Sequence, residues 1–274
     1  MAKIVIHPGI GKTATSAIQH VFYDFLPSTN QRDGFCYSPY GLMGNVHNIF
    51  ANNHPQFSQA KFELALGELV AFSKSYEGDI LISSEFLIRC NQQHISVLLK
   101  TLLKAGNDIC VILAIRNYSD YLISAFLQAV KVKWGMKKNE GILSYCEREL
   151  NNINLPKLIG NWSDVIGDEN IFILDYDENK KEILSKFADF FNVTLPQKSD
   201  VKINQSISIP TANILLEFDK YCHDNRKRMD LIRFLGECGF QNTLPTTIRQ
   251  NVLKSVGERY LKDKDILKQK YRSI

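Results

Sequence analysis

The chain has 274 residues, of which 45% are hydrophobic and 23% charged, and its formal net charge is +4. This balance is typical of a globular protein with a full hydrophobic core and excludes a disordered chain. So small a positive charge excludes nucleic acid as the expected main partner. The cysteines are scattered, without a Cys-x-x-Cys pair, so we expect no zinc site.

The apolar run at the N-terminus ends at His7 and is too short for a secretory signal or a membrane anchor. No other stretch approaches the roughly 18 apolar residues that a membrane helix needs. We therefore expect a cytoplasmic protein without a transmembrane segment.

Short apolar runs recur along the chain and predict a parallel sheet. They are rich in β-branched residues, alternate with helical patterns and cover residues 3–7, 35–38, 79–83, 108–115 and 170–175. Within them, 80–82 and 110–115 are apolar at every position, which is typical of strands covered on both faces. The pattern predicts an α/β fold in which helices flank a central parallel sheet in three layers.

Helical periodicity occupies the segments between these runs and after the last one. Apolar residues recur at helical spacing over 62–70, 95–103, 158–166 and 183–191. From about residue 208 onward the pattern is helical and contains no strand. There is no repeat and no long linker. We expect a single domain over residues 1–274, with an α/β core over about 1–200 and a helical C-terminal portion over about 208–274.

A glycine-rich turn joins the first predicted strand to a well-patterned amphipathic helix, whose apolar positions extend from Ala14 to Leu26. The turn contains Gly9, Gly11, Lys12, Thr13, Ala14, Thr15 and Ser16. Amide groups at the start of a helix, together with the helix dipole, bind anions, and glycines let the backbone approach closely. Lys12 adds a positive charge, and the hydroxyl groups add donors. These features predict a phosphate-binding loop and, with it, a fold of the P-loop type.

This loop only partly matches that of nucleoside triphosphate enzymes. Gly11-Lys12-Thr13 fits the end of GxxxxGK[ST], but Ile6 occupies the place of the first glycine. Such enzymes also need an acid at the end of a later strand to hold Mg²⁺. The strands that end near Ser83 and Ile115 lack one, and only the strand that ends at Asp175 has it. A P-loop kinase or nucleotide hydrolase is therefore disfavoured but stays an alternative. A non-catalytic nucleotide-binding module is the other.

A second motif follows the predicted strand 108–115. Arg116 stands at the end of this strand, and Ser124 lies eight residues further on, in a helix that begins near Ser119. An arginine at a strand end and a serine on the next helix can hold a second phosphate from two sides.

The two motifs together resemble the superfamily of sulfotransferases that use 3′-phosphoadenylyl sulfate (PAPS). Its loop for the 5′-phosphosulfate typically reads KTGTTxLQ, which residues 12–19 match as KTATSAIQ, and its 3′-phosphate motif is Arg followed eight residues later by Ser. Looser likeness at 83–85, 173–177 and 204–206 extends the resemblance over roughly residues 3–210. It is closest to bacterial members that modify glycans. Ala14 replaces the usual loop glycine, which we expect to be tolerated if this residue is already helical.

The resemblance implies a sulfotransferase that moves the sulfuryl group of PAPS to a hydroxyl or amine of an acceptor, which for glycan-modifying members is a carbohydrate or glycolipid. Lys12 would neutralise the charge that develops on the bridging oxygen as the adenosine bisphosphate leaves, and Thr13 to Ser16 would hold the 5′-phosphosulfate. The product is adenosine 3′,5′-bisphosphate (PAP), and the chemistry requires no metal. Intact Lys12, Arg116 and Ser124 argue against a non-catalytic module. We expect the acceptor pocket to be built from loops, here residues 39–60 and 132–142.

Two residues compete for the role of general base. Glu85 follows the third predicted strand, at the sheet edge where open α/β folds bind ligands. His47 lies in a loop-like stretch after the second strand, and sequence alone does not decide between them. His7, at the end of the first strand, is expected to pack on the sheet.

Further residues carry weaker expectations. Tyr118, Tyr121 and Trp134 could line a sugar-binding cleft or pack in the core. The basic triplet at 226–228 is a counterpart of the basic loop of animal sulfotransferases only by composition, and a solvated helix start is the simpler interpretation.

Overall fold

The structure is a computed structural model that describes residues 2–25, 34–133, 135–138, 140–195, 206–240 and 246–274. Its contacts divide the chain into two compact units. The first comprises Met1–Arg116, Asn154–Val201 and Asp263–Ile274, and the second comprises Asn117–Ile153 and Lys202–Lys262. The expectation of a single domain over 1–274 stays a prediction. Within the described ranges, no helix is both long and apolar enough to cross a membrane.

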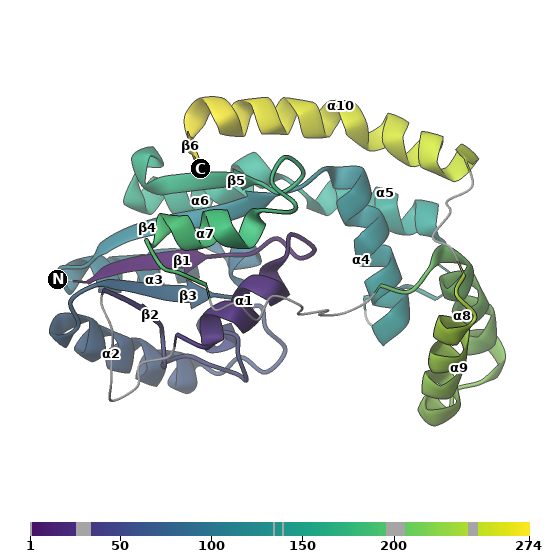
Figure 1. Cartoon of the computed structure of the whole chain (residues 1–274), viewed down its shortest axis with the longest axis horizontal. Coiled ribbons are helices and arrows are strands. Elements are labelled where there is room, and N and C mark those ends of the chain that lie inside the picture. The colour runs from purple at the N-terminus through teal and green to yellow at the C-terminus, as the bar shows by residue number, and fades with distance from the viewer. Residues whose placement is uncertain (1, 26–33, 134, 139, 196–205, 241–245) are drawn as a thin grey trace. The chain divides into compact units, whose positions relative to one another are not determined.

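The first unit is built on a six-stranded sheet in which all pairings are parallel (Figure 1). In the order β2-β3-β1-β4-β5-β6, the strands are β2 (Phe35–Tyr37), β3 (Asp79–Ser83), β1 (Lys3–His7), β4 (Asp108–Ile115), β5 (Ile171–Asp175) and β6 (Arg272–Ser273). The five predicted strands are confirmed to within one residue at each end. The expectation that no strand follows residue 208 is wrong, because β6 pairs with β5 through Phe172 and Arg272.

Helices cover both faces of this sheet, which confirms the predicted three layers. Helices α1 (Thr15–Tyr23) and α7 (Ile183–Phe190) pack on one face, while α3 (Gln92–Lys104) and α6 (Leu155–Ile166) pack on each other and on β4. Helix α2 (Gln59–Ser75) packs against α3. Helix α1 ends at Tyr23, earlier than the apolar pattern predicted.

Burial on two sides explains the continuous apolar runs of the central strands. Cys110 and Ile112 of β4 belong to the core under α1 and α7, together with Phe22 and Phe187. Successive side chains of a strand point to opposite faces, so Val111 and its alternate neighbours lie on the other side, where they are also buried. A strand buried on both faces has no polar side, and its sequence therefore shows no alternation.

The second unit is helical. It contains α4 (Tyr118–Val132), α5 (Ile142–Asn152), α8 (Ile209–Tyr221), α9 (Asn225–Glu237) and the first part of α10 (Thr246–Lys270). Arg228 is buried, pairs with Asp219 at 2.8 Å and donates hydrogen bonds to the carbonyls of Val130 and Lys131 at the end of α4. The basic triplet does lie at a helix start, but Arg228 is engaged in holding helices together rather than solvated.

Candidate functional site

The loop between β1 and α1 has a tightly constrained backbone. The amide of Gly9 donates to the carbonyls of His7 and Ser84, at 3.0 and 3.2 Å. A Cβ atom at position 9 would come within 2.5 Å of the Thr15 methyl carbon, so only glycine fits there. The turn is therefore anchored on β1, on the end of β3 and on the first residue of α1.

Hydroxyl groups hold the loop from inside. Thr13 and Thr15 are buried, and the Thr13 hydroxyl donates to the Ile10 carbonyl at 2.6 Å. The first amide groups of a helix have no carbonyl partner within it, so those of Thr15 and Ser16 point out of the N-terminal end of α1 with its positive dipole. The loop and this helix end together have the construction of an anion-binding site.

Ala14 is not helical, which corrects the expectation stated for it. Helix α1 begins at Thr15, and Ala14 precedes it in the left-handed region with φ 61°, close after Lys12 with φ 72°. The sulfotransferase motif has glycine at this place, the residue that adopts a positive φ without steric cost. The alanine of this chain therefore carries local backbone strain.

Replacing Ala14 with glycine should stabilise the protein by about 1 kcal/mol, because it removes the steric cost of a left-handed alanine. The matched control is Ala17→Gly within α1, which should destabilise by a similar amount, about 1 kcal/mol, because the helical backbone favours alanine. Unfolding in urea measures both. A loss of stability in both variants would show that residue 14 is not left-handed in the folded protein.

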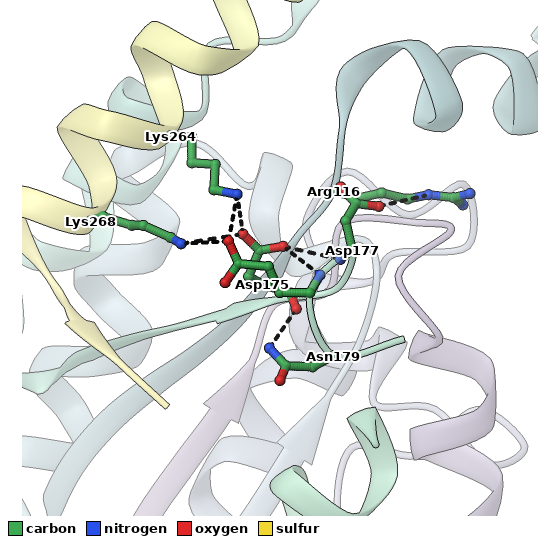
Figure 2. A network of polar contacts seen from close by, with 7 residues as sticks. Arg116, Asp175, Asp177, Asn179, Lys264 and Lys268 are labelled. Atoms are coloured by element: carbon green, nitrogen blue, oxygen red, sulfur yellow. Dashed lines mark hydrogen bonds and ion pairs between the residues drawn. The ribbon is translucent and has the colours of Figure 1, made fainter. Parts of the chain in front are cut away.

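Arg116 extends from the end of β4 to the phosphate loop (Figure 2). Its NH1 group donates to the Lys12 carbonyl at 2.8 Å, so two of the predicted site residues lie side by side. Its Nε atom is 4.0 Å from Asp177 Oδ1, and its guanidinium carbon is 5.0 Å from the centre of the Tyr176 ring. Ser124 lies half-buried on α4 in the second unit, so its partnership with Arg116 stays a prediction.

Asp175, the strand-end acid, is held by lysines of α10. Its Oδ2 lies 2.5 Å from Lys264 Nζ and 3.6 Å from Lys268 Nζ, as Figure 2 shows. Its Oδ1 accepts hydrogen bonds from the amides of Asp177 and Glu178. The carboxylate is thus neutralised and shared between a turn and a helix. Across the described parts of the chain, no group of three or more His, Cys, Asp or Glu residues could hold a metal ion.

Glu85 lies next to the phosphate loop. It follows β3, is half-buried, and its Oε2 would be 3.5 Å from a Cβ atom placed on Gly11. Burial raises the pKa of the Glu85 carboxyl, and the charge of Lys12 partly opposes that rise. A carboxylate with a raised pKa is a stronger base than an exposed one, which suits proton abstraction.

His47 is fully buried, and both of its ring nitrogens are in use. Nδ1 accepts from the Ser83 amide at 3.0 Å, which leaves the proton on Nε2, 3.0 Å from the Ser38 carbonyl. Burial lowers the pKa of His47 to about 4. This histidine ties the loop before η1 (Asn48–Phe50) to β3, and its geometry offers no free nitrogen to a substrate.

His7 packs on the sheet as expected. It is fully buried, its Nδ1 lies 2.9 Å from the Ser83 hydroxyl, and its ring is 5.0 Å from that of Phe187. Burial lowers the pKa of His7 to about 3. Its contact with Ser83 fastens β1 to β3 directly below the loop.

The aromatic residues proposed for a sugar cleft are buried where they can be described. Tyr118 is packed against Tyr260 at 5.2 Å between ring centres, and Tyr121 is also buried. Both therefore fit the alternative of core packing. Trp134 lies outside the described residues, and so does the Asn204-Gln205 part of the looser family likeness.

Sequence reasoning missed two groups at this site. Asp177 approaches Arg116 from the turn after β5, and the Ser84 hydroxyl donates to Asn48 Oδ1 at 2.6 Å beside Glu85. Asp177 follows the predicted strand 170–175 by two residues, and the carboxyl ends of parallel strands meet at one edge of a sheet, which was the available signal.

No family model and no curated protein matches the sequence. Among solved structures, the chain is similar to a sulfotransferase from Alicyclobacillus acidocaldarius, with 13% identity and a TM-score of 0.44 over 83% of this chain and 99% of that one. It is similar to mouse sulfotransferase SULT7A1 complexed with PAP, with 16% identity and a TM-score of 0.42 over 86% and 88%. It is also similar to a tunicamycin resistance protein from Deinococcus radiodurans, with 13% identity and a TM-score of 0.39 over 71% and 98%.

Two of these three structures are sulfotransferases. With TM-scores below 0.5, the likeness carries no argument about this chain. The residues of the loop and of the strand ends carry the functional proposal.

Proposed function

We propose that this protein is a cytoplasmic sulfotransferase that moves the sulfuryl group of PAPS to a hydroxyl or amine of an acceptor, a carbohydrate or glycolipid. One observation carries the proposal: the Arg116 side chain donates a hydrogen bond to the carbonyl of Lys12, in a loop whose sequence resembles the 5′-phosphosulfate motif of sulfotransferases. A phosphate loop with a strand-end arginine beside it suits a nucleotide with phosphates at two positions.

The donor would be held at its two phosphate groups. Lys12, the hydroxyl-bearing residues Thr13, Thr15 and Ser16, and the amides at the start of α1 would bind the 5′-phosphosulfate. Gly9 and Gly11 would let the backbone approach it, with Ala14 in the left-handed turn between them and the helix. Arg116 and Ser124 would bind the 3′-phosphate.

In the reaction, the acceptor oxygen attacks sulfur and a new S–O bond forms, while the bond from sulfur to the bridging oxygen of the 5′-phosphate breaks. Glu85 takes the proton of the acceptor hydroxyl, and PAP leaves with the bonding electron pair. Lys12 neutralises the charge that develops on the bridging oxygen. We prefer Glu85 to His47 as the base because both nitrogens of His47 are occupied by backbone groups.

Incubation with PAPS and a panel of glycans, glycolipids and phenols tests this proposal. We expect an acceptor in the panel to gain the mass of one sulfuryl group (SO₃), with release of PAP in the absence of metal. A phosphorylated product made from ATP and Mg²⁺ instead would contradict the proposal and identify a kinase.

A further inference from the structure

The guanidinium of Arg116 is approached by two different partners. The Lys12 carbonyl accepts a hydrogen bond from NH1, and Asp177 lies on the Nε side at 4.0 Å, too far for a hydrogen bond but close enough for an ion pair. The Nε atom itself is buried and has no hydrogen-bond partner among the described residues. The arginine is therefore drawn toward the turn after β5 by charge.

This turn is itself held in place, as Figure 2 shows. Asp175 Oδ1 accepts from the amides of Asp177 and Glu178 at 3.1 and 3.2 Å, and the Asn179 side chain donates to the Asp175 carbonyl at 2.8 Å. On its other oxygen, Asp175 meets Lys264 at 2.5 Å. The backbone that carries Asp177 is thus fixed from the side of α10.

We infer that Asp177 is a positioning residue for Arg116, an inference that rests on the proposed binding of the 3′-phosphate by this arginine. With NH1 held by the Lys12 carbonyl and Nε facing Asp177, no described residue takes the remaining N–H groups of the fork, and these can donate to a phosphate. A side chain that is already ordered loses less conformational freedom when the ligand binds.

The direction in which PAP affinity changes when Asp177 is neutralised distinguishes a positioning role from simple charge repulsion. A carboxylate near an anion site repels the anion, so its neutralisation would by charge alone tighten the binding of PAP. Loss of positioning acts in the opposite direction. If Asp177 orders Arg116, neutralising it weakens PAP binding although the repulsion has been removed.

The test compares Asp177→Asn with Glu178→Gln. Glu178 is the matched control, since it is an acid of the same turn but pairs with Lys264 and Lys268, each at 2.9 Å. Both variants and the wild type are titrated with PAP and with AMP, which lacks the 3′-phosphate. We expect Asp177→Asn to weaken PAP binding by about tenfold, with AMP binding unchanged, and Glu178→Gln to change neither. Combined with Arg116→Ala, Asp177→Asn should have no further effect.

The outcomes separate this inference from the proposed function. Unchanged or tighter PAP binding by Asp177→Asn would overturn the inference, while a wild type that still prefers PAP to AMP would leave the proposed function standing. Equal weakening of PAP and AMP, with a lower melting temperature, would assign Asp177 a structural role and also overturn it. A wild type that binds PAP no better than AMP would overturn the proposed function itself.

Discussion

Replacing Lys12 with alanine should slow sulfate transfer by about 10²–10³-fold while weakening PAP binding much less. The reason is that part of the attraction between this ammonium and the donor develops only as the bridging oxygen gains charge in the transition state. Single-turnover transfer from PAPS measures the rate, and calorimetry measures PAP binding.

Arg116→Ala is the comparison for this prediction and should show the reverse pattern, with a larger loss in PAP affinity than in the rate at saturating donor. Both residues belong to the same loop contact, so a general disturbance of the loop would affect the two variants alike. If both changed affinity alone, Lys12 would be a binding residue and the reaction would need another group to neutralise the leaving oxygen.

Replacing Glu85 with glutamine should lower turnover by about 10²–10⁴-fold with PAP binding retained, because the amide keeps the shape of the side chain but cannot accept a proton. In the wild type, the rate should fall on acidification through the pKa of Glu85, which burial raises above its ordinary value. This acid-side decline should be absent from the residual rate of Glu85→Gln.

His47→Asn serves as the control for the base. It should cost far less in turnover, although the buried hydrogen bonds of the ring make a lower melting temperature the expected result. A rate loss larger than that of Glu85→Gln, in a variant that stays folded, would transfer the role of base to His47.

Local patterns in the sequence were sufficient for most of the sheet and for the phosphate loop. A strand buried on two faces, as β4 is, must be apolar throughout, and a loop that binds phosphate needs glycine, lysine and hydroxyl groups before a helix. These requirements act over short segments and are therefore visible in one sequence. Strand β6 has two residues and no apolar run, so the sequence around it gives no signal of a strand. It is a strand because its backbone pairs with that of β5.

The contacts that complete the site are not local. Arg116 and the Lys12 carbonyl that it contacts are 104 positions apart in the chain. Lys264 belongs to the C-terminal helix and Asp175 to the end of β5, and no local pattern links the two. His47 was the second candidate for the base in the sequence, behind Glu85, because the burial and pairing of its nitrogens depend on β3 and on Ser38 and are not visible locally. The left-handed conformation of Ala14 likewise follows from the turn as a whole, and apolar periodicity carries no information about it.

Titration with PAP and with AMP, in the presence of a metal chelator, tests the central claim most directly because it does not require the acceptor. We predict that PAP binds without metal and raises the melting temperature, by an amount corresponding to about 2.7 kcal/mol at 100 times its dissociation constant, and that AMP at the same concentration does much less. Equal binding of the two nucleotides, or binding of ATP that requires Mg²⁺ and exceeds that of PAP, would contradict the account.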